Sequence, residues 1–272
     1  MRIAVPIKQV PETGAVHMDE ATGTMIREGV EAIVNPLDLY AIELALRLVA
    51  GTSPDQSAPR GEVVAVSMGP PKADKAVREA LAIGCDAGAL VSDSAFAGSD
   101  TWATSYVLAA AIRKLGPFDL ILCGERATDG DTGQVGPGLA AWLDLAAVTY
   151  VSKVRAVEPV RIVVERLVED GREVVEMALP GLLTVVKEIG DPRLPTLRGK
   201  QKAKAAAVPK WGPADLEVKR ENLGLAGSPT RVVKIFRPTV ARQGRKLVAS
   251  DEASTAAAVE QAIEFLKAKQ LL

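Results

Sequence analysis

Short apolar runs alternate with amphipathic stretches along the first half of this 272-residue chain, and this alternation constrains the fold most. A short apolar run bounded by turn residues is typical of a strand buried on both faces, and apolar residues every three to four positions are typical of a helix. Such strands need helices over both faces, so the alternation predicts an α/β fold with a doubly wound parallel sheet. The expected strands are residues 3–7, 63–66, 89–91 and 120–123, and the expected helices are residues 36–49, 73–83, 102–115 and 139–145.

The pattern changes after residue 148. Runs at 161–167 and 173–178 flank Glu169-Asp170-Gly171, which predicts an antiparallel hairpin, and residues 182–186 form another apolar run. A smaller hairpin is expected from 16–19 and 25–28. Residues 208–248 contain prolines and glycines with little periodicity, which favours an extended arm, and Ser250 is placed to cap a final helix with the stripe Val259, Ile263 and Leu266.

Composition excludes several classes of function. The net charge of −1 and the aromatic content of 4% argue against a nucleic-acid partner. His17 is the single histidine, which argues against a histidine-based zinc site or a Ser-His-Asp triad. We expect no metal and no catalytic acid or base.

The same composition bears on the compartment. No apolar run approaches the roughly 20 residues of a membrane span, and the N-terminal segment MRIAVPIKQV is too short for a signal peptide. Cys85 and Cys123 both lie in apolar contexts, which predicts two buried thiols and a cytoplasmic protein.

The turn within residues 123–140, CGERATDGDTGQVGPGLA, is the strongest candidate for a ligand site. A strand that ends in a glycine-rich turn and leads into a helix presents unpaired backbone N–H groups to an anion. Gly130, Gly133 and Gly136 allow close backbone approach, Thr132 can cap the helix, and Gln134 can reach a base or ribose. An ordinary, well-capped strand-to-helix loop is the alternative. The G-x-G-x-x-G pattern is missing after the first strand, and so is a P-loop pattern.

Four segments at strand ends can converge on one ligand, because ligands of parallel sheets bind beyond the carboxyl ends of the strands. They are residues 6–8, 35–38, 67–69 and 124–136. Carboxylates beside a phosphate would repel it, so we expect Asp129 and Asp131 to cap backbone N–H groups or to pair with Arg126. Arg126 is the best candidate for a cation that faces a diphosphate.

Four passages together resemble one family. They are VPIKQVPET near the start, VNPLDLYAIELAL at 34–46, CGERATDGDTGQVGP at 123–137, and VVERLVEDGREVVEMALPGLLTV at 163–185 leading to PRLPTLRGKQKAK. In this order they look like the β subunit of electron-transfer flavoproteins. The resemblance implies a heterodimer with an α subunit that holds FAD, an adenine nucleotide in the present chain, and docking to an acyl-CoA dehydrogenase or a related flavoenzyme.

The resemblance also implies site residues. The expected cofactor-binding residues are Pro6, Asn35, Pro36, Leu37, Asp38, Met68, Gly124, Glu125, Arg126, Asp129, Gly130, Asp131, Thr132, Gly133, Gln134 and Val135. Leu197 matches the leucine that such proteins insert into their dehydrogenase partner, and Leu194 projects from the same loop. The chain is therefore divided into an α/β nucleotide-binding domain (1–190), a partner-recognition loop with its helix (191–207), and a C-terminal arm (208–272). The arm wraps its own domain or, as we prefer, lies on a partner subunit.

The turn departs from the AMP-binding branch of the family, which has a form like Asp-Asp-x-x-Gln-Thr-Gly-Gln. The sequence DGDTGQVGP at 129–137 looks like the electron-bifurcating branch, whose β subunit holds a second FAD and accepts a hydride from NADH. One electron then passes to the α-subunit flavin and one to a low-potential acceptor such as ferredoxin or flavodoxin. Leu167 stands where respiratory members have a carboxylate used in a subunit contact. The alternatives are a structural AMP in a non-bifurcating protein, and a nucleotide-sensing or ATP-hydrolysing α/β domain.

Overall fold

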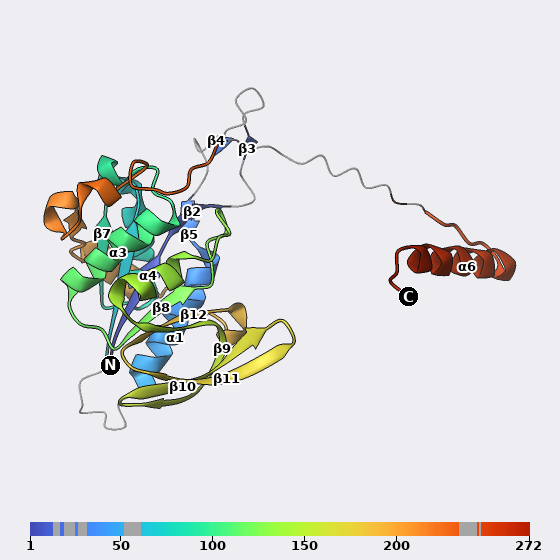
Figure 1. Cartoon of the computed structure of the whole chain (residues 1–272). Helices are drawn as coiled ribbons and strands as arrows, with labels where there is room; N and C mark the ends of the chain where they lie inside the picture. Colours follow the sequence, from blue (N-terminus) through green and yellow to red (C-terminus); the bar gives the residue numbers. More distant parts are fainter. Residues whose placement is uncertain (13–16, 19–24, 27–31, 52–60, 234–243, 245) are drawn as a thin grey trace. The chain divides into compact units, whose positions relative to one another are not determined.

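A computed structural model describes residues 1–12, 17–18, 25–26, 32–51, 61–233, 244 and 246–272 (Figure 1). The chain divides into two units, Met1–Lys234 and Ile235–Leu272. The first unit holds the sheet and the helices that pack on it, and the second holds the C-terminal helix.

A nine-stranded sheet forms the first unit, in the order β11-β10-β9-β12-β8-β1-β6-β7-β13. The strands from β9 to β13 in this order run parallel, and β10 pairs antiparallel with both β9 and β11. The predicted α/β fold with a parallel sheet is confirmed. The bounds are β1 (Arg2–Ile7), β6 (Glu62–Met68), β7 (Ala87–Val91), β8 (Leu120–Gly124), β9 (Ala146–Glu158), β10 (Arg161–Val168), β11 (Gly171–Ala178), β12 (Gly181–Val185) and β13 (Lys210–Trp211).

Helices cover both faces of this sheet, since alternate residues of one strand belong to different buried clusters. Ile3 and Val5 of β1 pack with α1 (Pro36–Gly51) and α2 (Asp74–Ile83), whereas Ala4 packs with α3 (Thr101–Leu115) and α4 (Val135–Leu143). Asp100 caps α3, and Gly84 ends α2 with φ +147°. The sequence predicts both of these helix boundaries.

Smaller elements complete the fold. Strands β2 (Gln9–Pro11) and β5 (Ala32–Val34) pair antiparallel, as do β3 (His17–Met18) and β4 (Met25–Ile26), which form the core of the expected small hairpin. The rest of that hairpin lies outside the described residues. The 3₁₀ helices are η2 (Pro71–Ala73), η3 (Ser94–Phe96), η4 (Lys187–Ile189), η5 (Pro213–Asp215) and η6 (Arg220–Asn222).

Strand β9 is the main element that the apolar runs did not reveal. It is half covered, with exposed or partly exposed residues such as Lys153 and Arg155 between buried ones such as Val151. A strand of this kind alternates instead of forming a continuous apolar run. Because β9 pairs with both β12 and β10, the predicted hairpin of β10 and β11 extends the central sheet instead of standing apart.

The start of the predicted arm packs on the first unit. Strand β13 pairs in parallel with β7, and Leu216 and Leu223 are buried in the cluster that contains Phe96. The prediction of an extended arm is therefore wrong for residues 210–223. This segment forms the short 3₁₀ helices η5 and η6, which apolar periodicity does not detect.

The second unit ends in α6 (Glu252–Ala268). Asp251, rather than the predicted Ser250, caps this helix, because its carboxylate accepts a hydrogen bond of 2.8 Å from the Ser254 N–H. None of the described residues of α6 is buried, and Val259 and Ile263 of the predicted stripe are exposed. Among the helices that the structure describes, none has the length and apolar character needed to cross a bilayer.

Candidate functional site

A cavity of about 850 Å³ lies at the carboxyl ends of β1, β6, β7 and β8. It reaches from the end of β1 and the start of α1 to the glycine-rich turn and the first residues of α4. All four segments that the sequence predicts at strand ends contribute to its lining, so the predicted convergence is observed. Residues from the cofactor-binding prediction that line the cavity are Pro6, Asn35, Asp38, Met68, Gly124, Glu125, Arg126, Gly130, Thr132, Gly133, Gln134 and Val135.

Four residues of that prediction, Pro36, Leu37, Asp129 and Asp131, lie outside the lining. The Leu37 backbone lies against the end of β8, since a Cβ on Gly124 would lie 2.8 Å from the Leu37 carbonyl group. Asp129 and Asp131 belong to the outer side of the turn, where they form ion pairs.

One wall of the cavity was missed by the sequence reasoning. It is the connection from β7 to α3, which contributes Ser92, Asp93, Phe96, Asp100 and Thr101 among others. The sequence did contain a signal for this wall, because residues 89–91 are predicted as a parallel strand, and its carboxyl end lies at the same edge of the sheet as those of the other strands. Its run, Ala-Leu-Val, is followed by serine and aspartate, and this sequence contains no glycine motif that would indicate a ligand site.

The N-terminus of α4 opens into the cavity. Gln134 occupies the N-cap position, but among the described residues no side chain caps the helix there. The predicted cap by Thr132 is thus absent, and the Gln134 amide oxygen accepts a hydrogen bond of 2.8 Å from the Thr101 hydroxyl. Gly133 has φ +65°, a conformation that favours glycine. The uncapped N–H groups and this turn suit a phosphate group.

Two cations stand beside the turn. Lys8 lines the cavity and its Nζ lies 2.6 Å from a carboxylate oxygen of Asp129. The Arg126 Nε lies 3.1 Å from an oxygen of Asp131, as predicted, and 3.8 Å from one of Glu125. The two aspartates are thus turned toward cations, and an anionic ligand in the cavity would meet Lys8 and Arg126 instead of unpaired carboxylates.

Asn35 and Asp38 connect β1, α1 and the turn. The Asn35 side-chain amide donates to the Arg126 carbonyl (2.9 Å) and to Asp38 (2.9 Å), and its oxygen accepts from the Thr128 N–H (3.2 Å). Asn35 therefore holds the turn, because its side-chain oxygen accepts from the Thr128 N–H and not from an N–H of the first turn of α1. Asp38 also accepts from the Lys8 N–H at 2.8 Å.

Burial dominates the ionisation of Asp38. Desolvation raises the pKa of this carboxyl from 3.8 to about 7, although hydrogen bonds from Lys8 and Asn35 and the charge of Lys8 oppose the shift. Burial, followed by the charge of Asp38, also raises the pKa of the Cys123 thiol well above its usual range. Cys85 and Cys123 are both buried as thiols, as predicted.

The two leucines predicted to contact a partner lie on the surface of the first unit. Leu194 is 84% exposed and Leu197 is 81% exposed. Leu197 is the first residue of α5 (Leu197–Ala205), which Thr196 caps by accepting a hydrogen bond of 3.0 Å from the Gly199 N–H. Arg198, Lys200, Lys202 and Lys204 make this helix basic.

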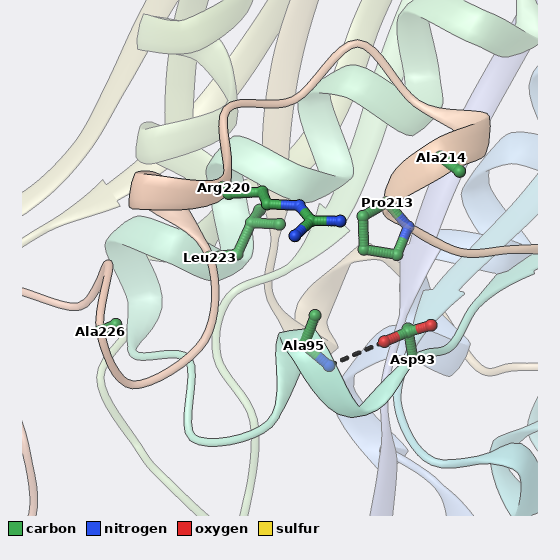
Figure 2. Close-up of a pocket in the computed structure, with 7 residues that line it drawn as sticks. All are labelled: Asp93, Ala95, Pro213, Ala214, Arg220, Leu223 and Ala226. Atoms are coloured by element: carbon green, nitrogen blue, oxygen red, sulfur yellow. Dashed lines mark hydrogen bonds between the residues drawn. The ribbon is translucent and has the colours of Figure 1, made fainter.

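A second, shallower cavity of about 530 Å³ adjoins the first and shares Asp93 with it. Figure 2 shows it between η3 and the 213–226 segment, with the Arg220 guanidinium extending toward Pro213. Asp93 accepts a hydrogen bond of 2.8 Å from the Ala95 N–H, which caps η3. Within the described parts of the chain, no cluster of three or more His, Cys, Asp or Glu side chains could hold a metal ion.

Comparison with protein families adds an independent finding. A model described as "Electron transfer flavoprotein domain" matches residues 22–216. This range includes α1, the turn before α4 and the loop with Leu194 and Leu197. It thus contains most of the features that form the site.

Named relatives cover nearly the whole chain. The chain is 46% identical over 245 residues to the electron transfer flavoprotein subunit beta of Thermoanaerobacterium thermosaccharolyticum. The matched region covers 90% of this chain and 91% of that protein. It is 47% identical over 238 residues to subunit CarD of the caffeyl-CoA reductase-Etf complex of Acetobacterium woodii, with 88% of each chain covered. Protein FixA of Bradyrhizobium diazoefficiens is 39% identical over 267 residues, with 96% and 90% covered.

Proposed function

Because the chain belongs to the electron transfer flavoprotein family as a β subunit, we propose that it binds FAD in the cavity at the carboxyl ends of β1, β6, β7 and β8. β subunits of this family transfer electrons in a heterodimer with an α subunit. The observation that carries the proposal is the uncapped N-terminus of α4, which opens into this cavity beside Lys8 and Arg126.

The size of the cavity favours a dinucleotide. Its volume of about 850 Å³ lies toward the upper end of the roughly 300–1,000 Å³ range of small-molecule sites. Gly130 and Gly133 leave room for phosphates at the turn, and the β7–α3 wall extends the space beyond the adenosine end at Pro6, Asn35 and Met68. This additional wall supports FAD over AMP.

The chain's own residues bind and orient the cofactor in this proposal. Backbone N–H groups at Val135 and Gly136 hold phosphate oxygens, and Arg126 and Lys8 supply positive charge as they turn from their aspartates. Asn35 keeps the turn in place through its bonds to Arg126 and Thr128. FAD, when bound, supplies hydride acceptance and single-electron transfer.

We further propose that the heterodimer bifurcates electrons. NADH is the donor, and the electrons pass to the α-subunit flavin and to a low-potential acceptor such as ferredoxin or flavodoxin. The partner is an acyl-CoA dehydrogenase or a related flavoenzyme, contacted through Leu194 and Leu197. The cytoplasm is the proposed compartment, because Cys85 and Cys123 are buried as thiols.

Nucleotide extraction from the purified heterodimer tests the proposal. Chromatography is expected to yield two FAD and no AMP per heterodimer, and NADH is expected to bleach the flavin absorbance. One FAD and one AMP, with no reduction by NADH, would overturn both the FAD assignment and bifurcation, and would leave a non-bifurcating carrier with a structural AMP.

A further inference from the structure

Glu43 is a buried carboxylate in the middle of α1, outside the cavity, and it accepts hydrogen bonds from two arginines. Its side chain is only 6% exposed. Arg193 donates to it through its backbone N–H (3.1 Å), Nε (2.7 Å) and Nη2 (3.1 Å), and Arg47 donates through Nε (2.6 Å). Burial opposes ionisation, but the hydrogen bonds from Arg193 and Arg47 outweigh it and hold the pKa of Glu43 below its usual range.

Arg47 binds the start of the same loop. Its Nη2 donates to the Asp191 carbonyl at 3.1 Å. Gly190 has φ +137°, and a Cβ there would clash with Nη1 of Arg47. The backbone therefore crosses directly over this arginine. We call residues 191–197 the docking loop, and α1 holds its first half through Glu43 and Arg47.

Helix α2 holds the other end through α5. The Arg78 Nη1 donates to the Ala203 carbonyl at 2.6 Å. A Cβ on Gly199 would clash with the Ala82 carbonyl oxygen, so the first turn of α5 touches the end of α2. The docking loop is thus tethered at both ends, while Leu194 and Leu197 remain exposed between the tethers.

This arrangement specifies geometry more than it stabilises the fold. A buried ion pair adds little net stability, because desolvation of the charges offsets their attraction. A preformed loop, in contrast, loses less conformational entropy when it binds. We propose that Glu43 is a positioning residue: through Arg193 it holds the docking loop in its binding conformation, so that Leu194 and Leu197 meet the partner flavoenzyme without reordering. This inference rests on the docking role proposed above for the two leucines.

Helix α1 also connects the loop to the cavity. Asp38 lies in the first turn of α1 and lines the cavity, and Glu43 follows five residues later, which corresponds to a rise of about 7.5 Å along the helix. A rigid helix therefore carries both a cavity residue and the carboxylate that holds the docking loop. Mounting two sites on one regular element keeps their separation constant.

Arg193→Ala in the complete heterodimer is the primary test, with a short-chain acyl-CoA dehydrogenase as the partner probe. The variant is expected to raise the KM for the dehydrogenase about tenfold and to leave kcat unchanged, because only the ordering of the loop is lost. Amide hydrogen exchange at 191–197 is expected to speed up. Arg161→Ala is the matched control: Arg161 is 44% exposed, against 45% for Arg193, and pairs with Glu158 of β9 and Glu176 of β11 instead of with α1.

A double-mutant cycle with Leu197→Ala separates this inference from the docking proposal. If Arg193 acts through the docking loop, its substitution adds less to the KM when Leu197 is already alanine than it does alone. Additive effects in the double variant would overturn the role of Glu43 only. The same conclusion would follow if Leu197→Ala raised the KM and Arg193→Ala left it normal. A normal KM for Leu197→Ala would overturn the docking role itself. Glu43→Gln, which keeps the side-chain volume and replaces one acceptor oxygen by a donor, is expected to reproduce the Arg193→Ala phenotype.

Discussion

At the scale of single residues, the site depends on polar groups that hold the backbone rather than on groups that react. Asn35 bonds to Arg126 and Thr128 at the start of the glycine-rich turn, and the buried Asp38 accepts hydrogen bonds from Lys8 and Asn35. Asp38 is the group whose charge state depends most clearly on this environment, because burial raises its pKa to about 7.

Asp38→Asn should change the dependence of stability on pH. The folded-state pKa of Asp38 is raised from 3.8 to about 7, so the folded chain keeps this proton to a higher pH than the unfolded chain. The resulting contribution to the free energy of unfolding is complete below about pH 4. As the pH rises from about 4 to 7, the wild-type chain should lose stability relative to the asparagine variant, by up to about 1.4 kcal/mol per pH unit. Urea unfolding of both proteins between pH 4.5 and 7.5 measures the difference, with Asp170→Asn in the exposed β10–β11 turn as control. A difference that does not vary with pH would contradict the prediction.

Gly133→Val should lower nucleotide occupancy several-fold. Gly133 has φ +65° and lines the cavity, and a branched side chain there strains the turn and occupies space beside the phosphates. Gly171→Val is the control for strain alone, since Gly171 has φ +146° in the distant β10–β11 turn, with open space around it in the described structure. Ultraviolet and flavin absorbance of the purified variants measures the bound nucleotide. Equal loss in both variants would show that strain, not the cavity, is responsible.

At the scale of elements, our proposals assign one helix end to a ligand and one exposed side chain to a partner. The N-terminus of α4 lacks a side-chain cap among the described residues, and α5 begins with an exposed leucine. An exposed leucine gains nothing from the protein's own core, so its use is expected in an interface.

Leu197→Ala should weaken docking to the dehydrogenase without affecting reduction by NADH. Truncation of an interface anchor typically costs about 2 kcal/mol, which corresponds to a rise in KM of roughly 30-fold. Val160→Ala is the control, because Val160 is 70% exposed at the β9–β10 turn. Steady-state transfer measured against dehydrogenase concentration gives the KM. If the two variants behave alike, the leucine has no special role.

At the scale of the whole molecule, the chain consists of a sheet-containing unit and a separate helical segment. Residues 1–234 hold the cavity and both buried clusters on the sheet, whereas α6 contributes no buried residue among those described.

Truncation after Lys234 should leave the first unit folded and impair assembly. Since α6 buries nothing among the described residues, its removal is expected to leave the thermal unfolding of the isolated β chain unchanged. Association with the α subunit is expected to weaken at least tenfold, because an amphipathic helix gains its stability from the surface it covers. Analytical ultracentrifugation of the co-expressed subunits measures this. A truncated chain that unfolds at lower temperature would instead assign the segment to its own domain.

Periodicity and turn chemistry predict much of this protein. Continuous apolar runs identified β1, β6, β7, β8 and β12, and the Glu169-Asp170-Gly171 turn identified the hairpin of β10 and β11. These signals are local, since each depends on neighbouring residues alone. Ligands of parallel sheets bind at the carboxyl ends of the strands, and this rule predicted that Pro6, Asn35, Met68 and Gly124 line one cavity.

Tertiary structure alone decided the rest. The order of strands in the sheet places β12 between β8 and β9 and adds β13 beside β7, which no local pattern specifies. Asp129 pairs with Lys8, and Glu43 pairs with Arg193, although 121 and 150 positions of the sequence separate the partners. Such pairs depend on which elements meet in space, because a charged side chain has no preferred partner along the sequence. The sequence by itself therefore determined the elements and the edge of the sheet at which the site lies, and long-range packing determined which residues complete it.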